Sequence, residues 1–114
     1  MTAPVYDFVI EQGATLSKTV TVEGLNLTGA TARMQARRNH ADTAVAVDLD
    51  SASKGGIVLT ITDTNNATLA ITISATSTAI LTARLLYDLE VVLADGTVYR
   101  LLQGKIVLSR EITR

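Results

Sequence analysis

The strongest constraint on the fold is an alternation of side chains with a period of two, seen most clearly over residues 84–94. The odd positions of this stretch are all apolar: Leu85, Tyr87, Leu89, Val91 and Leu93. Because successive side chains in a strand point to opposite faces, this pattern predicts a strand with one buried face. Asp95-Gly96 follows directly, and this dipeptide favours the tight turn of a β-hairpin. Residues 84–94 and 97–114 are therefore predicted to pair as the last hairpin of the chain.

The same period recurs along the rest of the chain. Further strands are predicted over residues 5–10, 16–22, 30–38, 45–49, 57–62 and 67–73. Seventeen Thr, eleven Val and eight Ile, all β-branched residues that suit pleated sheets, make up almost a third of the 114 residues. The sequence DTNN separates the last two of these runs, so they are predicted to form another hairpin. Ser74 can cap a helix of about two turns over residues 74–81.

These elements predict an all-β fold, an antiparallel, immunoglobulin-like β-sandwich of seven to eight strands with one short helix before the last hairpin. A small barrel would satisfy the same strand pattern. A chain of 114 residues has the size of one domain, so residues 1–114 are predicted to form a single sandwich. With no cysteine, no tryptophan and only one phenylalanine, the core must be built mainly from aliphatic side chains.

Composition argues against several classes of function. Ten Lys and Arg against eleven Asp and Glu give a net charge of −1, which predicts no basic surface for nucleic acid. No run approaches the ~20 apolar residues of a membrane helix, and the start of the chain shows no secretory signal. Without cysteine, and with His40 as the only histidine, neither a zinc cage nor a thiol nucleophile is expected. No enzyme activity, cofactor or small-molecule substrate is therefore predicted.

Two pairs of carboxylates could carry chemistry. Asp48 and Asp50 share one face of a predicted strand near Ser51, and clustered oxygens can bind Ca²⁺. A solvated strand end explains this pair equally well. Asp88 and Glu90 also share a face, and paired carboxylates can hydrolyse glycosides. That reaction requires a cleft and usually aromatic platforms, so a solvated hairpin face is the favoured interpretation.

Three other features have simple structural interpretations. Arg33, Arg37 and Arg38 could contact nucleic acid or an acidic partner, but neutralisation by the aspartates that follow them, Asp42, Asp48 and Asp50, is expected. His40 lies in a polar turn, and nothing beside it suggests a catalytic triad. Tyr87 resembles the tyrosine corner of sandwich folds. A buried tyrosine whose hydroxyl bonds to the backbone accounts for it as well.

The last strand contains a change of phase. Tyr99 and Leu101 are apolar at odd positions, whereas Leu102 and Ile106 are apolar at even positions. A β-bulge near Leu102 to Gly104 would insert one residue and reset the alternation. Alternatively, the short helix or a partner covers Leu101.

Strand edges are the remaining candidates for function, because unpaired edges must be protected or used. The runs MTAPVYDFVI and VLSREITR place predicted strands close to both ends of the chain. This arrangement favours packing against copies of the chain or against other proteins over catalysis. The candidate interface residues are Leu101, Leu102, Gln103, Arg33 and Arg37.

Several stretches carry a resemblance to a known family. They are YDFVIEQGATLSKTVTV (6–22), LTGATARMQARR (27–38), LAITISATSTAIL (69–81) and LLYDLEVVLADGTVYRLLQGKIVLSREITR (85–114). In this order and spacing the chain resembles small structural proteins of tailed bacteriophages, similar to the immunoglobulin-like N-terminal domain of siphophage upper baseplate proteins. The matching motifs define a fold and no site, so the resemblance assigns no functional residue.

The resemblance implies that the protein is a component of the virion, so the virion is its expected location. Its expected partners are other virion proteins and copies of itself. The expected role is a tail, baseplate or fibre connector. Such domains often lead into a longer receptor-binding region, whereas this sequence stops at Arg114, so a cement protein on the capsid surface is an alternative. A module that binds host glycans is a further alternative, which the shortage of aromatic residues disfavours.

Overall fold

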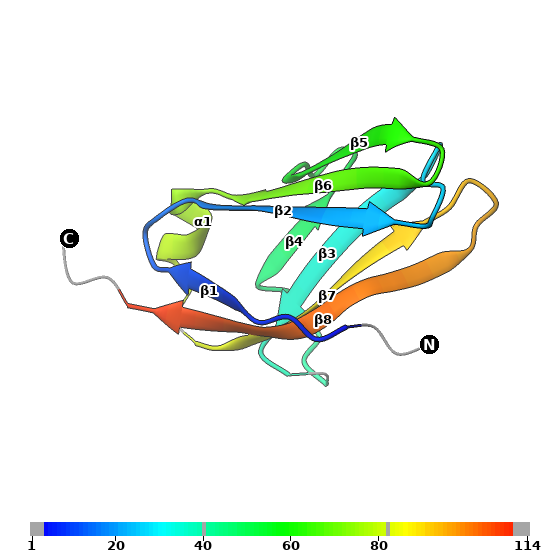
Figure 1. The fold of residues 1–114 in the computed structure, drawn as a ribbon. Helices are drawn as coiled ribbons and strands as arrows, with labels where there is room; N and C mark the ends of the chain where they lie inside the picture. Colours follow the sequence, from blue (N-terminus) through cyan, green and yellow to red (C-terminus); the bar gives the residue numbers. More distant parts are fainter. Residues whose placement is uncertain (1–3, 40, 82, 111–114) are drawn as a thin grey trace.

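The computed structural model describes residues 4–39, 41–81 and 83–110. Within these residues the chain forms eight strands and one short helix (Figure 1). In chain order they are β1 (Phe8–Glu11), β2 (Leu16–Glu23), β3 (Thr31–Arg37), β4 (Val47–Asp50), β5 (Ile57–Asp63), β6 (Asn66–Ile73), α1 (Ala75–Ala79), β7 (Leu85–Val92) and β8 (Val98–Ser109).

The strands form two sheets packed face to face. One sheet has five strands in the order β1-β8-β7-β3-β4, and the other has three in the order β2-β6-β5. In an immunoglobulin constant domain strands B, E and D share one sheet and strands C, F and G share the other. Here β2, β6 and β5 correspond to B, E and D, and β3, β7 and β8 correspond to C, F and G. The predicted all-β, immunoglobulin-like sandwich is therefore confirmed.

The prediction of a wholly antiparallel sandwich is wrong at one place. β1 runs parallel to β8, with Phe8 opposite Ile106 and Glu11 opposite Ser109. Both strands run toward the end of the sandwich where residues 12–15 cross to the other sheet and the chain returns as β2 (Figure 1). Alternation within a strand reports which face is buried and carries no information on the direction of a neighbour.

Side chains of one parity from both sheets build the core. Those with less than 2% of their surface exposed include Ile10, Met34, Leu69, Ile71, Leu89 and Ile106. Aromatic residues enter the core only beside β1, where the ring of Phe8 lies between those of Tyr6 and Tyr87, at centroid distances of 5.1 and 4.9 Å. The core is thus built mainly from aliphatic side chains, as predicted. Burial of such apolar surface is the main favourable term in folding.

Both predicted hairpins are present. β5 pairs with β6 and β7 pairs with β8, each antiparallel. At the second turn the backbone N–H of Leu93 donates to the carbonyl of Thr97 at 2.8 Å, and the carboxylate of Asp95 accepts from the N–H of Thr97 at 2.9 Å. Gly96 takes a positive φ of 92°, which this turn requires and glycine adopts without strain.

The predicted helix is α1, and packing at one end of the sandwich holds it in place. Ser74 caps it by accepting from the N–H of Ser77 at 3.2 Å. Thr78 is fully buried; its hydroxyl accepts from the N–H of Gly13 at 3.1 Å and donates to the carbonyl of Ala14 at 2.7 Å. These bonds attach the helix to the crossing between β1 and β2, which compensates for its short length.

Candidate functional site

The outer face of the five-stranded sheet carries the charged residues that the sequence singles out. Its strands alternate in charge, with acidic side chains on β4, on β7 and on β1 with the residue just before it, and basic side chains on β3 and β8. In spatial order the pairs are Asp48 and Asp50, Arg33 and Arg37, Asp88 and Glu90, Arg100 and Lys105, and Asp7 and Glu11. Opposite charges on neighbouring strands stabilise this order of strands by modest amounts each.

Glu90 is the centre of an ion-pair cluster on this face. Its Oε1 lies 2.9 Å from Nη2 and 3.0 Å from Nε of Arg33. On the other side Arg100 approaches more loosely, with Nε 3.9 Å from Glu90 Oε2 and Nη2 3.7 Å from Asp88 Oδ2. The partner of Arg33 is therefore Glu90 of the adjacent strand β7 and not, as predicted, one of the aspartates that follow it in sequence.

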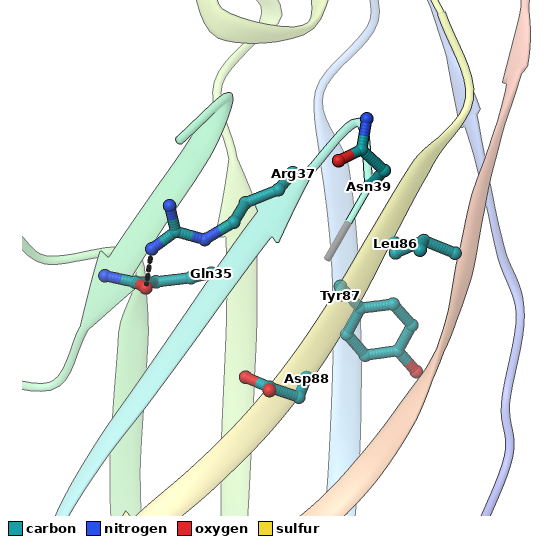
Figure 2. Close-up of a pocket in the computed structure, with 6 residues that line it drawn as sticks. All are labelled: Gln35, Arg37, Asn39, Leu86, Tyr87 and Asp88. Carbon is teal, nitrogen blue, oxygen red and sulfur yellow. Dashed lines mark hydrogen bonds between the residues drawn. The ribbon is translucent and has the colours of Figure 1, made fainter. Parts of the chain in front are cut away.

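Arg37 lies beside a shallow hollow at the end of β3 (Figure 2). Its Nη2 donates to Oε1 of Gln35 at 3.0 Å, and its Nη1 donates to the carbonyls of Asp42 and Thr43 at 3.2 and 2.8 Å. The hollow, of about 180 Å³, is lined by Gln35, Arg37, Asn39, Leu86, Tyr87 and Asp88. Arg37 thus orders the chain after β3 through hydrogen bonds to backbone carbonyls. The expected neutralisation by Asp42 is not found, because Arg37 contacts the backbone carbonyl of Asp42 and not its carboxylate.

Asp88 is the acidic group of this hollow. Partial burial raises the pKa of its carboxyl group above the ordinary value, and the neighbouring charge of Glu90 raises it further, against the opposing effect of Arg100. Asp88 and Glu90 do share the outer face, as predicted. Their closest charged neighbours are arginines, which is the arrangement of a cross-strand ion-pair cluster.

Asp48 and Asp50 also share a face, as predicted, but other groups occupy their oxygens. Asp48 Oδ2 lies 2.7 Å from Nζ of Lys54. Asp50 Oδ1 accepts from the backbone N–H groups of Ala52, Lys54 and Gly55, and the first of these bonds contributes most to lowering its pKa. In the described part of the chain no three His, Cys, Asp or Glu residues lie close enough together to hold a metal ion.

The predicted bulge in β8 is present, but the extra residue is Leu101. Leu102 lies opposite Leu89 and Arg100 lies opposite Glu90, which leaves Leu101 without a partner on β7. Before the bulge the odd-numbered residues, such as Tyr99, face inward, and after it the even-numbered residues, such as Leu102, do so. The bulge therefore explains the change of phase. Leu101 is half-buried and packs against the core.

The five candidate interface residues therefore divide between the two sides of the sheet. Arg33, Arg37 and Gln103 lie on the outer face, with Gln103 opposite Asp88. Leu102 faces the core, and Leu101 occupies the bulge. The three polar candidates therefore share the outer face of the sheet, and the two leucines do not lie on that face with them.

Gly104 has a different role from the one predicted. A Cβ atom at this position would lie 2.5 Å from the carbonyl oxygen of Tyr6 and 2.8 Å from Oδ1 of Asp7. Glycine therefore allows the segment before β1 to approach β8 closely. A lone glycine within a strand can mark either a bulge or a close approach of backbone, and sequence alone does not separate these two cases.

The approach at Gly104 replaces one bond of the β1–β8 ladder. The N–H of Gln103 donates to the carbonyl of Pro4 at 3.1 Å, so regular spacing would direct the N–H of Lys105 to the carbonyl of Tyr6. The Lys105 N–H instead donates to Oδ1 of Asp7 at 2.9 Å, and the Tyr6 carbonyl accepts from the hydroxyl of Tyr87.

The buried tyrosine with a backbone partner is thus confirmed. The tyrosine-corner interpretation is wrong, because the partner belongs to the N-terminal segment and not to residues just upstream of Tyr87.

Beside this attachment, the flank formed by β1 and β8 exposes apolar side chains. Val9 and Val107 lie opposite each other on the outer face, with 58% and 43% of their surfaces exposed. Val5, which pairs with Gln103, is 71% exposed. β1 is also an edge strand, paired only with β8. We refer to Val5, Asp7, Val9, Glu11 and Val107 as the β1 flank.

His40 lies outside the described residues. Arg38 is exposed. Over residues 4–39, 41–81 and 83–110, no helix has the length and apolar character needed to cross a membrane. Comparisons with protein-family models and with curated proteins find no match to the chain.

Proposed function

We propose that the chain is a structural protein of a tailed-bacteriophage virion. In this role it acts as an assembly or attachment module of the tail, baseplate or fibre connector, through contacts with other virion proteins and with copies of itself. The single observation that carries the proposal is the β1 flank, where exposed valines lie beside an unpaired strand edge. Soluble sandwiches usually protect such edges, so an apolar edge favours a surface that another protein covers.

Two further observations support an assembly role. The sequence resembles phage structural proteins over most of its length, in stretches that define strands. Near the middle of the outer face the charged side chains pair with groups of the same chain, as Glu90 does with Arg33 and Asp48 does with Lys54. Repetition in a symmetric particle allows many weak contacts to add through effective concentration, so a small flank is sufficient.

The direct test is the protein content of purified, washed virions. We expect quantitative mass spectrometry to find the chain at a copy number that matches a ring or lattice symmetry. Separation of tails from capsids then distinguishes a tail or baseplate component from the alternative of a capsid cement protein. Absence of the chain from washed virions would overturn the proposal.

A variant pair connects the β1 flank to incorporation. Val9→Asp places a charge on the flank, whereas Thr19→Asp places the same charge at an exposed position on the outer face of the other sheet. We expect Val9→Asp to reduce incorporation into virions by roughly tenfold, which corresponds to a contact weakened by about 1.4 kcal/mol. Circular dichroism of both purified variants shows whether they keep the fold, and equal incorporation of the two would contradict the role of the flank.

A further inference from the structure

The free edge of β1 presents backbone N–H groups that no other described strand pairs, while the carbonyl of Glu11 at its end accepts from the N–H of Ala14 at 3.0 Å. The N–H groups of Tyr6 and Gln12 donate to β8, at 2.9 and 2.8 Å. Because consecutive N–H groups of a strand point in opposite directions, those of Asp7, Val9 and Glu11 point away from β8. With the bridge between Val5 and Gln103, this edge extends over residues 5–11.

The other three edges each carry a protective feature. β2 places Lys18 on its inward-facing side, opposite the buried Ile71. β4 is four residues long, and the N–H of Asp50 is bonded to the carbonyl of Gly55 at 3.0 Å. The pairing of β5 with β6 becomes irregular between Ile61 and Asp63. Inward charges, short strands and irregular pairing all oppose the addition of another strand, and the β1 edge lacks a comparable inward charge.

The side chains of the β1 edge determine which charge a strand bound at this edge should carry. Asp7, Val9 and Glu11 alternate acidic, apolar and acidic on the outer face, and all three are exposed. Pairing of β1 with β1 of a second copy would place like charges opposite each other, which is destabilising. The edge is instead complementary to a strand that alternates basic, apolar and basic.

The chain itself contains such a segment directly after β8. Residues 110–114 read REITR, with Arg110, Ile112 and Arg114 on one parity. Residues 111–114 lie outside the described part of the chain, and only their amino-acid sequence is used to judge whether they match the β1 edge. A basic strand next to β1 would also continue the alternation of acidic and basic strands across the outer face. Ile112 would extend the row formed by Val107 and Val9.

The segment cannot reach the free edge of β1 in its own copy with all three side chains in place. Ser109 lies opposite Glu11, so the chain would have to cross the end of β1 and travel about 10 Å sideways, two strand spacings. At about 3.3 Å per residue this crossing uses about three of the five residues. The matching edge is therefore that of a second copy.

We propose that the free edge of β1 binds residues 110–114 of a second copy as an added strand, so that copies join head to tail. This inference rests on the proposed assembly function. Main-chain hydrogen bonds would supply affinity, and the acidic edge would supply specificity for the basic segment. A head-to-tail contact closes into a ring or continues as a filament, depending on the rotation between copies.

Self-association of the full-length chain is the first test. Sedimentation velocity at rising protein concentration should detect association that is strongest at low salt, because exposed charge pairs are screened by salt. Glu11→Arg should weaken it roughly five- to tenfold. Glu23→Arg, an equal change of charge at an exposed position on β2, is the matched control and should leave association unchanged.

Charge reversal on both partners identifies the orientation. With Val9 opposite Ile112, an antiparallel strand places Glu11 opposite Arg110, and a parallel strand places it opposite Arg114. Association lost in Glu11→Arg should therefore return when either Arg110→Glu or Arg114→Glu is added, but not with both equally. If neither restores it, the proposed pairing is wrong.

A backbone test is independent of charge. Val9→Pro removes one outward N–H of the free edge and leaves the bonds of Tyr6 and Gln12 to β8 in place, a position where edge strands tolerate proline. In the ¹⁵N spectrum of the full-length chain, millimolar peptide SREITR should shift the amides of Asp7, Val9 and Glu11. The rearranged peptide SIRERT should not shift them, and Val9→Pro should abolish the effect of SREITR.

A chain that stays monomeric and an unchanged spectrum with SREITR would overturn this inference, even if virions contain the protein. Association that depends on Glu11 would stand even if virions lack the protein. The two proposals therefore fail independently.

Discussion

At the level of single residues, the contact between the N-terminal segment and β8 depends on two side chains and on the absence of a third at Gly104. Gly104 admits the Tyr6 carbonyl, Tyr87 binds that carbonyl, and Asp7 takes over the N–H of Lys105. Every polar group displaced from the regular ladder thereby keeps a partner, as buried polar groups must.

The requirement for glycine at this position can be tested by adding one methyl group. In Gly104→Ala the new Cβ would collide with the Tyr6 carbonyl, so we expect a loss of about 2–4 kcal/mol in the free energy of unfolding. Gly24→Ala is the control, since a Cβ there meets nothing within 4 Å and only its positive φ of 80° adds strain, about 1–2 kcal/mol. Urea unfolding followed by circular dichroism measures both, and an equal loss in the two variants would contradict the close approach.

Tyr87 makes stability dependent on pH in the alkaline range. Burial raises the pKa of its hydroxyl above the ordinary value of 10.0. The folded chain therefore keeps this proton at a pH where the unfolded chain has lost it. The stability from this group is complete below about pH 10 and falls as the pH rises further, by at most about 1.4 kcal/mol per pH unit.

Tyr87→Phe isolates this contribution. The variant should lose about 1–2 kcal/mol of stability at neutral pH, because the Tyr6 carbonyl loses its partner. Above about pH 10 its stability should fall less steeply than that of the unchanged protein. Urea unfolding at a series of pH values gives both slopes, with Tyr99→Phe, at an exposed tyrosine, as the control. Identical slopes for Tyr87→Phe and the unchanged protein would show that Tyr87 does not control the alkaline decline.

At the level of elements, the four edge strands differ in how they meet solvent. β2 is eight residues long and would be the most extended template for aggregation, yet Lys18 points to its inward-facing side. A charge there resists burial if another sheet covers that side. The β1 edge has its charges on the outer face, where they select a partner instead of repelling all partners.

Replacement of Lys18 tests this protection. Lys18→Val should increase aggregation on heating or prolonged storage, because the edge of β2 then presents an uninterrupted apolar inner face. Thr19→Val, the next position along the strand, adds similar apolar surface on the outer face and should aggregate less. Light scattering at equal protein concentration compares the two, and greater aggregation of Thr19→Val would contradict the assignment.

At the level of the whole molecule, the last strand, β8, pairs with the first strand, β1, so the two ends of the described chain lie side by side. The bond between Asp7 and Lys105 connects residues 98 positions apart. Loop closure over such a distance must precede the contacts that stabilise it, which slows folding.

The folding rate should follow from this topology. We expect refolding in milliseconds to seconds, the range of sandwiches dominated by non-local pairing. Stopped-flow tyrosine fluorescence is suited to the measurement because the chain has no tryptophan. Refolding within microseconds would show that local contacts dominate instead.

Sequence alone determined the strands, both hairpins and the capped helix, and it placed the change of phase in the last strand for which a bulge was one of two explanations. These features depend on local physics, because the period of side chains, the Asp95-Gly96 turn and the Ser74 cap all act within a few residues. The same logic placed Asp48 with Asp50, and Asp88 with Glu90, on shared faces.

Tertiary structure decided the rest. It set the parallel direction of β1, the position of the extra residue at Leu101, the pairing of Arg33 with Glu90 and the role of Gly104. Each of these depends on which strand lies beside which, and a period of two identifies the face of a side chain but not its neighbour. The β1 flank became a candidate surface only when the fold left that edge unpaired.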